Sequence, residues 1–300
     1  MATTRTATAT DSAATALAAR PRSLWRDAWT RLLKNKAAMF GGILVLLIIV
    51  AGVAAPLIAP YDPIKQNLRA SLLSPSSAHW FGTDVHGRDI FSRILYGAAI
   101  SLRIGFLGAL LSGSIGIVLG MVSGYYGGKV DMLIMRLVDI QLAFPGLLLA
   151  IAIIAVIGPG LENVIIAVGI FSIPTFTRVV RGSVLSIRER DFVAAARTIG
   201  ATNSRIMRLH LFPNILAPVL VLLTMRIATA ILTAASLSFL GLGAQPPSPE
   251  WGAMLSDGRD YLMLAPHVAT FPGLVILLAV LGFNLLGDGL RDALDPRMRI

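Results

Sequence analysis

Six long apolar stretches constrain the fold of this chain more than any other feature. They cover approximately residues 39–59, 104–126, 136–157, 161–180, 214–240 and 266–286. Each has the roughly 20 residues that a helix needs to cross a bilayer. Hydrophobic residues make up 55% of the chain and charged residues only 14%, well below the roughly 25% of a soluble domain. We therefore expect an all-α membrane protein, a polytopic bundle of six transmembrane helices, and exclude a soluble enzyme.

Lysines and arginines between the apolar stretches indicate the orientation of the bundle. Seven lie in residues 1–36, two in 129–136, seven in 178–208 and three in 291–299, which makes nineteen, against five on the other side. Because the side richer in lysine and arginine is cytoplasmic, and six spans return the chain to the side where it starts, both termini are predicted to be cytoplasmic. The basic residues mark this orientation, and they form no soluble basic face that would bind nucleic acid.

The spans divide the chain into five parts. Residues 1–23, rich in alanine and threonine, are expected to form a disordered cytoplasmic tail, and residues 24–38 a cytoplasmic amphipathic helix. Residues 39–60 would form the first transmembrane helix and residues 61–97 an external loop. Residues 98–300 would contain the other five spans, with a cytoplasmic segment at 183–213 between the fourth and the fifth.

Small residues recur at every fourth position of the second span, at Gly108, Ser112, Gly116, Gly120 and Gly124. Such a stripe lets two membrane helices approach closely, and we interpret it as packing inside the bundle rather than as a discrete dimer motif. In the third span, Pro145 removes a backbone hydrogen bond and is expected to kink or hinge the helix.

Arg226 lies well inside the fifth span, where an arginine is costly, so it is expected to face protein, water or an interface. It is a candidate for lining a transport pathway, and an arginine that extends toward the cytoplasmic surface is the alternative. Arg136 and Asp139 share a helix face and are expected to pair. No chain of acids or histidines runs through the spans, which weakens the hypothesis of a proton-coupled carrier.

Catalytic and metal-binding patterns are missing from the sequence. The chain has no cysteine, no zinc-protease HExxH, no GxSxG elbow and no P-loop. His79 and His86 share a loop with Asp84 and Asp89, but their spacing matches no compact zinc pattern, and we expect no metal site. A protein of this kind is not expected to be an enzyme, so a partner or an ion gradient must supply the energy for any uphill transport.

The segment between the fourth and fifth spans predicts two short cytoplasmic helices that meet at a corner. Asp191 can cap a first helix that runs through Arg197, and Gly200 suits the left-handed turn that ends it. Thr202 or Asn203 can cap a second helix, which Pro213 would stop before the fifth span.

Four apolar residues, Phe192, Ala195, Ala196 and Ile199, are predicted to share one face of the first helix. A small apolar face beside arginines suits insertion into a groove on another protein. A helix that lies on the membrane surface is the alternative.

The same segment resembles the coupling motif of the permeases of ABC importers, which reads EAA, three residues, glycine, nine residues and I-x-L-P. The match falls on Ala195, Ala196, Gly200 and Pro213, while Ala194 stands where the family usually has glutamate. The residues that the resemblance assigns to ATPase coupling are Asp191, Phe192, Ala194, Ala195, Ala196, Arg197, Gly200 and Pro213.

Further motifs are similar to those of the dipeptide, oligopeptide and nickel branch of this family. They are PYDP at 60–63, HWFGTDVHGRD at 79–89, GYYGG at 124–128, Asp139 with Phe144 and Pro145, LSFLGLG at 237–243 and PEWG at 249–252. Their order and the long first external loop resemble those of the C-type permease subunit.

The resemblance implies a type I importer fold in the bacterial inner membrane and a set of partners. These would be a related B-type permease, two ATPase subunits that hold ATP and magnesium, an extracytoplasmic solute-binding protein and membrane lipid. This chain would bind no cofactor itself and would form half of a pathway for dipeptides or oligopeptides. Nickel, glutathione or another small solute is an alternative cargo, and a self-sufficient secondary carrier or channel is the alternative from another class.

Overall fold

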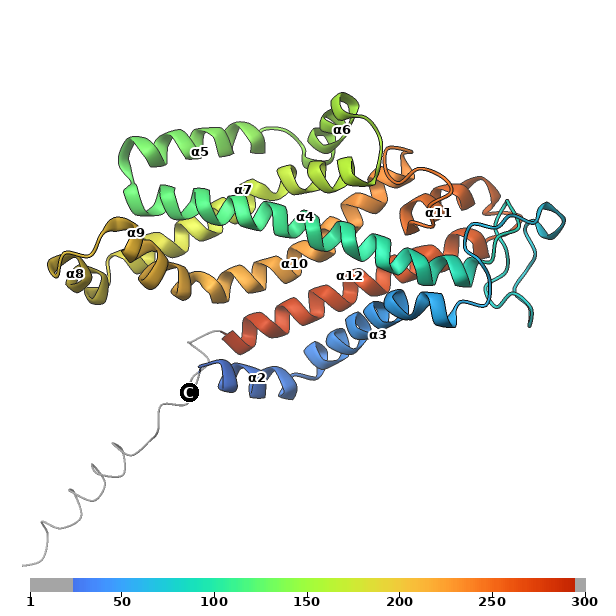
Figure 1. Cartoon of the computed structure of the whole chain (residues 1–300), viewed down its shortest axis with the longest axis horizontal. Coiled ribbons are helices and arrows are strands. Elements are labelled where there is room, and N and C mark those ends of the chain that lie inside the picture. Colours follow the sequence, from blue (N-terminus) through green and yellow to red (C-terminus); the bar gives the residue numbers. More distant parts are fainter. Residues whose placement is uncertain (1–23, 295–300) are drawn as a thin grey trace, which may run out of the picture.

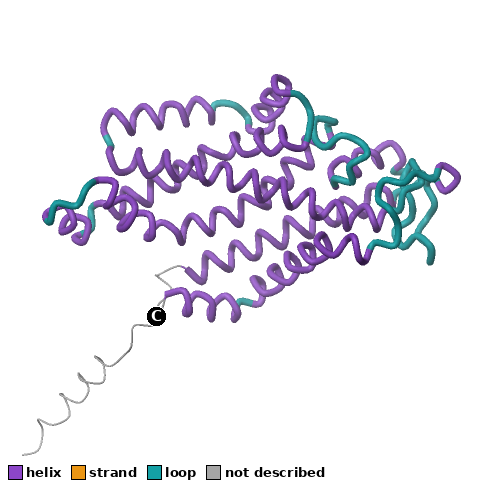
Figure 2. The backbone as a smooth tube through the Cα atoms, in the orientation of Figure 1, coloured by secondary structure: helices purple, strands orange, loops and turns teal. Residues whose placement is uncertain are grey.

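The computed structural model describes residues 24–294, which form an elongated bundle of helices (Figures 1 and 2). Among these residues there is no strand, only one isolated antiparallel bridge between Thr83 and Asp89. The main helices are α2 (Leu24–Lys34), α3 (Lys36–Ile58), α4 (Ile90–Tyr126), α5 (Gly128–Leu142), α6 (Gly146–Ile157), α7 (Leu161–Arg188), α8 (Asp191–Thr198), α9 (Asn203–Ile206), α10 (Phe212–Phe239), α11 (Trp251–Gly258) and α12 (His267–Leu294). The short helical turns are η1 (Leu68–Ala70), η2 (Met207–Leu211) and η3 (Arg259–Tyr261).

Five of these segments are long and apolar enough to cross a membrane as single helices: α3, α4, α7, α12 and the continuous run of α9, η2 and α10. A sixth span exists if the bent pair of α5 and α6 is counted as one. The predicted all-helical membrane bundle is therefore confirmed. α7 is its most enclosed span, with 56% of its apolar window buried, against 22% for α3, which lies at the edge of the bundle.

The third span bends near Pro145, where the sequence predicted a kink or hinge, but the bend is a complete break between two helices. α5 ends at Leu142, α6 begins at Gly146, and the two helices are bent by 90° (Figure 1). Pro145 supplies no N–H and disfavours helical geometry at the residue before it, so the chain breaks there instead of bending gently. Residues 1–23, for which we predicted a tail, lie outside the described residues.

Other boundaries also differ from the expectation. The helix expected over residues 24–38 is divided at Asn35, whose side-chain oxygen accepts hydrogen bonds from the N–H groups of Ala37 and Ala38 at 3.1 and 3.2 Å and so caps α3. α4 begins at Ile90, fourteen residues before the predicted start of its span, because Asp89 caps it through the N–H of Ser92 at 2.8 Å.

Ion pairs hold α5 against α7. Asp131 accepts two hydrogen bonds of 2.6 Å from Arg181, and Asp139 lies 2.6 Å from Arg178. The predicted pair of Arg136 and Asp139 is therefore wrong, because a neighbouring helix offers Asp139 an arginine that its own helix does not bring as close. These contacts tether α5 beside the bundle core.

α4 packs more extensively against α7 than any other pair of helices. The small residues that the sequence placed in one stripe are all buried in this contact or beside it. A Cβ on Gly120 would lie 2.6 Å from the carbonyl oxygen of Thr177 and 2.7 Å from Cβ of Val180. The stripe thus serves packing inside the bundle, as predicted, because only glycine lets the two backbones come this close.

Replacing Gly120 by alanine should destabilise the chain by about 1–3 kcal/mol, because the added methyl group overpacks this contact. Gly182 of α7 is the matched control, since a Cβ there meets nothing within 4 Å. Gly182→Ala should leave the stability unchanged or raise it slightly. Thermal unfolding of the two variants in detergent measures the difference, and equal midpoints would contradict the packing account.

Candidate functional site

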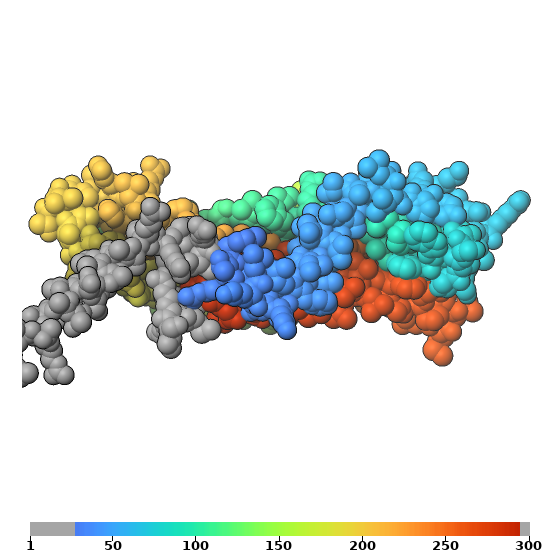
Figure 3. Space-filling model, turned by 90° about the horizontal axis from the view of Figure 1, so that it is seen from below, coloured from blue at the N-terminus to red at the C-terminus, as the bar shows by residue number. Residues whose placement is uncertain are grey.

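Two short helices, α8 and α9, project from one end of the bundle. They form a knob, defined here as residues 191–206, which extends beyond the ends of α3 and α12 (Figures 1 and 3). The loop between α3 and α4 lies at the opposite end of the long axis. The knob is therefore the part of the described chain best placed to contact a protein beyond that end of the bundle.

Backbone conformation, rather than a side-chain cap, sets where α8 begins and ends. Arg190, in an extended conformation, is the residue before its first turn and makes no side-chain cap, so the prediction that Asp191 caps the helix is wrong. Asp191 is instead the first helical residue, where a carboxylate complements the helix dipole. At the other end, the N–H of Ala201 donates to the carbonyl of Ala196 at 3.0 Å, and Gly200 has φ +81°. This is the left-handed turn that the sequence predicted.

The chain after this corner runs into the membrane span without a stop. Thr202 caps α9 by accepting from the N–H of Arg205 at 3.4 Å. η2 is a single π turn in which the N–H of Phe212 donates to the carbonyl of Met207, five residues back. Pro213 falls in the first turn of α10, and the wider turn before it accommodates the missing N–H. The prediction that Pro213 stops the second helix is therefore wrong.

α8, taken with the residue that follows it, Ile199, has an inner face and an outer face. Val193 and Ala196 are 0% and 4% exposed, whereas Phe192 and Ile199 are 39% and 85% exposed and Ala195 is also exposed. The predicted apolar face was therefore right for Phe192, Ala195 and Ile199 but wrong for Ala196, which packs inward. An apolar stripe at spacings of three and four residues thus remains open to a partner.

The inner face joins the knob to the bundle. Val193 and Ala196 belong to one buried cluster with Tyr125 at the end of α4. The Tyr125 hydroxyl donates to Oδ1 of Asn203 at 2.8 Å, and the guanidinium carbon of Arg197 lies 5.5 Å from the centre of its ring. α8 and α9 are therefore fixed to α4 through Tyr125, a residue that sequence reasoning noticed only as part of the GYYGG run.

Two more sequence-predicted site residues lie on α8, on sides that differ from the outer stripe. Ala194 is exposed, and Arg197 is exposed as well, with its guanidinium over the Tyr125 ring. Arg226 lies midway along α10, far from the knob, and is half-buried. The structure thus brings the predicted residues of α8 and Gly200 together in the knob, with Pro213 in the first turn of α10, and leaves Arg226 as a separate feature of the membrane span.

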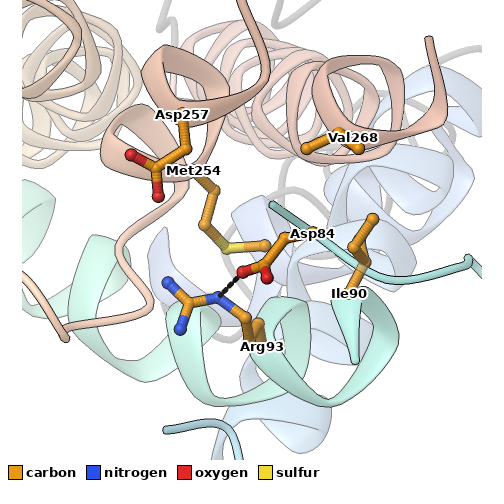
Figure 4. A pocket seen from close by; sticks show the side chains of 6 residues that line it. All are labelled: Asp84, Ile90, Arg93, Met254, Asp257 and Val268. Atoms are coloured by element: carbon orange, nitrogen blue, oxygen red, sulfur yellow. Dashed lines mark ion pairs between the residues drawn. The ribbon is translucent and has the colours of Figure 1, made fainter. Parts of the chain in front are cut away.

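A second polar cluster closes the opposite end of the bundle (Figure 4). Asp84 accepts a 2.6 Å hydrogen bond from Nε of Arg88 and lies 3.5 Å from Nε of Arg93, while Arg88 also reaches Asp257 at 3.4 Å. Burial raises the pKa of the Asp257 carboxyl. The space among these side chains is about 10 Å³, room for no more than one water molecule. This cluster therefore fixes the loop to the helices rather than holding a solute.

The two loop histidines do not converge on a metal site. Nδ1 of His79 pairs with Oδ1 of Asp89 at 2.9 Å, and its ring packs 4.7 Å from that of Tyr61. Within the described part of the chain, no group of three or more histidines and acids is arranged to hold a metal ion. His79 and Asp89 thus fold the loop onto the start of α4.

Comparison with known proteins agrees with this architecture. Residues 116–300 match the family of binding-protein-dependent transport system inner membrane components, and residues 23–75 match the N-terminal TM domain of oligopeptide transport permease C. An inward-facing structure of the methionine ABC transporter MetNI superposes with a TM-score of 0.56 at 21% identity, over 68% of this chain and 96% of that one. That likeness shows the type I importer fold.

Two curated relatives are similar over nearly their whole length. The dipeptide transport system permease protein of Alkalihalophilus pseudofirmus is 52% identical over 280 residues, which cover 92% of this chain and 91% of the relative. The glutathione transport system permease protein of Pectobacterium atrosepticum is 50% identical, with 93% of each chain covered. The chain therefore belongs to the inner-membrane permeases of ABC importers, in the dipeptide, oligopeptide and nickel branch, as a C-type subunit.

Proposed function

We propose that this ABC importer permease forms half of a translocation pathway for dipeptides or oligopeptides, together with a related B-type permease. An extracytoplasmic binding protein delivers the solute, and two ATPase subunits drive the transport. Both termini and the knob lie in the cytoplasm, as the nineteen-to-five distribution of basic residues predicts. The chain itself has no catalytic role, and ATP and magnesium are held by the ATPase subunits.

The main support for this proposal is the exposed, apolar outer face of α8. Phe192, Ala195 and Ile199 present an exposed apolar stripe on a helix that projects beyond the bundle. A short helix with such a stripe suits a groove on another protein. Its position past the ends of α3 and α12 favours an ATPase subunit over the membrane surface as the occupant.

The inner face of α8 supports a mechanical role. Movement of the knob passes through Tyr125 to α4 and, without a break in the helix, through η2 to α10. ATP binding would close the ATPase dimer and move the knobs of the two permeases together, which would switch the bundle between inward-facing and outward-facing states. Hydrolysis of ATP would return the bundle to its starting state.

The proposed solutes follow from the two curated relatives, which are named as dipeptide and glutathione permeases. Both names denote short peptides, so a peptide is the proposed cargo class. Nickel or another small solute is the second candidate within the family. A self-sufficient carrier would need ion-binding groups in the membrane, and the acids that lie on α5, Asp131 and Asp139, are already paired with arginines of α7.

Purification of the tagged chain from its native membrane in mild detergent, followed by mass spectrometry, tests the proposal. We expect a second permease and ATPase subunits to accompany it, and a peptide to be recovered from the associated binding protein. A chain that is recovered alone and still moves solute into liposomes without ATP would contradict the proposal and favour the carrier.

Two substitutions on α8 separate docking from folding. Ile199→Ser removes an 85% exposed apolar side chain and should weaken ATPase retention about tenfold or more, without changing the thermal stability of the chain. Val193→Ala empties a fully buried position and should lower the free energy of unfolding by about 2 kcal/mol. Retention assays and melting curves on both variants measure these effects. Full ATPase retention by Ile199→Ser would exclude this face as the docking surface.

Substitutions at Gly200 test the corner itself. A Cβ there meets nothing within 4 Å, so any effect comes from the left-handed backbone, which is especially unfavourable for a β-branched residue. Gly200→Val should impair ATP-driven uptake while membrane insertion stays normal, and Gly200→Asn should retain most of the activity because asparagine tolerates this conformation. Uptake assays at matched expression compare the two variants with the unaltered chain. Wild-type transport by Gly200→Val would refute the role of the corner.

A further inference from the structure

One side of α10 carries a polar stripe inside the membrane span. Arg226, Thr229, Thr233 and Ser236 follow one another at spacings of three, four and three residues, which places them within about 80° of one another around the helix. All four are half-buried or exposed. The opposite side of the helix packs into the bundle through buried apolar residues, Ile227, Ala230, Ile231 and Ala234.

The stripe lies at the depth of the apolar bundle core. Arg226 is fourteen residues after the first residue of α10 and thirteen before the last, which is about 20 Å from either end. Its neighbour Ile227 packs in one cluster with Val45 of α3 and Phe283 of α12, both well inside their own helices. Because Arg226 lies several turns from either end of α10, contact with lipid alone would be costly, and a hydrated or protein-lined surface is the favoured environment for its side chain.

Arg226 has no partner for its charge among residues 24–294, where it makes no ion pair and no hydrogen bond. Three arginines of the neighbouring helices α4 and α7 do have acidic partners: Arg103 with Glu162, Arg178 with Asp139 and Arg181 with Asp131. A half-buried arginine without a partner inside a membrane span is the kind of intramembrane charge that marks a pathway or a binding site.

The hydroxyl groups of the stripe leave Arg226 as its only free donor. Thr229, Thr233 and Ser236 donate to the carbonyl groups of Met225, Thr229 and Leu232, at 3.2, 2.9 and 2.9 Å. Their oxygens can still accept hydrogen bonds from water. A hydrated face with one guanidinium therefore selects an anion, and a guanidinium binds a carboxylate through two parallel hydrogen bonds.

We propose that this stripe lines the water-filled pathway between the two permeases and that Arg226 binds the carboxylate of the solute in transit. The inference rests on the proposed function and deepens it, because it names the chemical group that the pathway recognises. A dipeptide and glutathione both carry a free carboxylate, so one site serves both cargoes. A nickel cation would be repelled.

Cysteine accessibility tests the water-filled face directly, because the natural chain contains no cysteine. Thr229→Cys and Thr233→Cys, in the full complex in native membranes, should react with a water-soluble thiosulfonate reagent, since only a hydrated thiol ionises readily. Leu47→Cys on α3, at a position that is 59% exposed and apolar, is the matched control and should stay unlabelled. Equal labelling at all three positions, or none on α10, would overturn the proposal.

Reagents of opposite charge test whether the positive charge of Arg226 faces the pathway. At Thr229→Cys the ratio of the labelling rate with an anionic thiosulfonate to the rate with a cationic one should exceed the same ratio for a free thiol in solution, and Arg226→Gln should reduce this preference about five- to tenfold. Arg226→Lys keeps the charge and should keep the preference. An unchanged ratio in Arg226→Gln would show that Arg226 does not face the pathway.

Protection experiments identify the carboxylate without changing Arg226. Dialanine should slow labelling of Thr229→Cys by the anionic reagent, whereas dialanine amide, which lacks the carboxylate, should not. S-methylglutathione, whose blocked thiol cannot consume the reagent, tests glutathione as the second source of the carboxylate. Protection by dialanine or by S-methylglutathione supports the site. Equal protection by dialanine and its amide, or protection by neither dialanine nor S-methylglutathione, would overturn carboxylate binding. ATPase subunits that purify with the unaltered chain would then leave the proposed function standing.

Discussion

The close packing of α4 on α7 is the most extensive contact between two helices and positions the elements around it. Lipid is as apolar as leucine, so helices in a membrane gain little from hiding apolar surface and associate through close packing instead. The glycines of α4 let the two backbones meet along most of their length, and near the knob Arg188 donates to the carbonyl of Gly124 at 2.8 Å. This contact holds Tyr125 beside the end of α7, where the inner face of α8 packs against it.

The proposed mechanical role of the knob requires a firm attachment to the bundle, and the knob is attached in two ways. Its inner face is anchored on Tyr125, and its second helix continues through the π turn at η2 into α10. In the proposed mechanism, a displacement of α8 would be transmitted to α4 through side-chain packing and to α10 through the continuous backbone. Since α10 also carries the polar stripe with Arg226, the proposed energy input and the proposed solute contact lie on one continuous helical segment.

The sequence predicted most of the fold because hydropathy and backbone hydrogen bonding leave few choices in a membrane. It also predicted the left-handed turn at Gly200, which depends only on local conformation. Features that depend on neighbouring helices were missed. The break before Gly146, the inward direction of Ala196, the partner of Asp139 and the anchor at Tyr125 are all set by what packs against them.

Docking of the outer face of α8 into an ATPase subunit can be tested with a photoreactive amino acid at position 199, illuminated in native membranes, with buried position 193 as the control. If α8 docks in this way, position 199 should give a crosslinked product that contains this chain and an ATPase subunit, as identified by mass spectrometry, and position 193 should give no such product. Crosslinks from position 199 to lipid alone would contradict this docking and place α8 on the membrane surface.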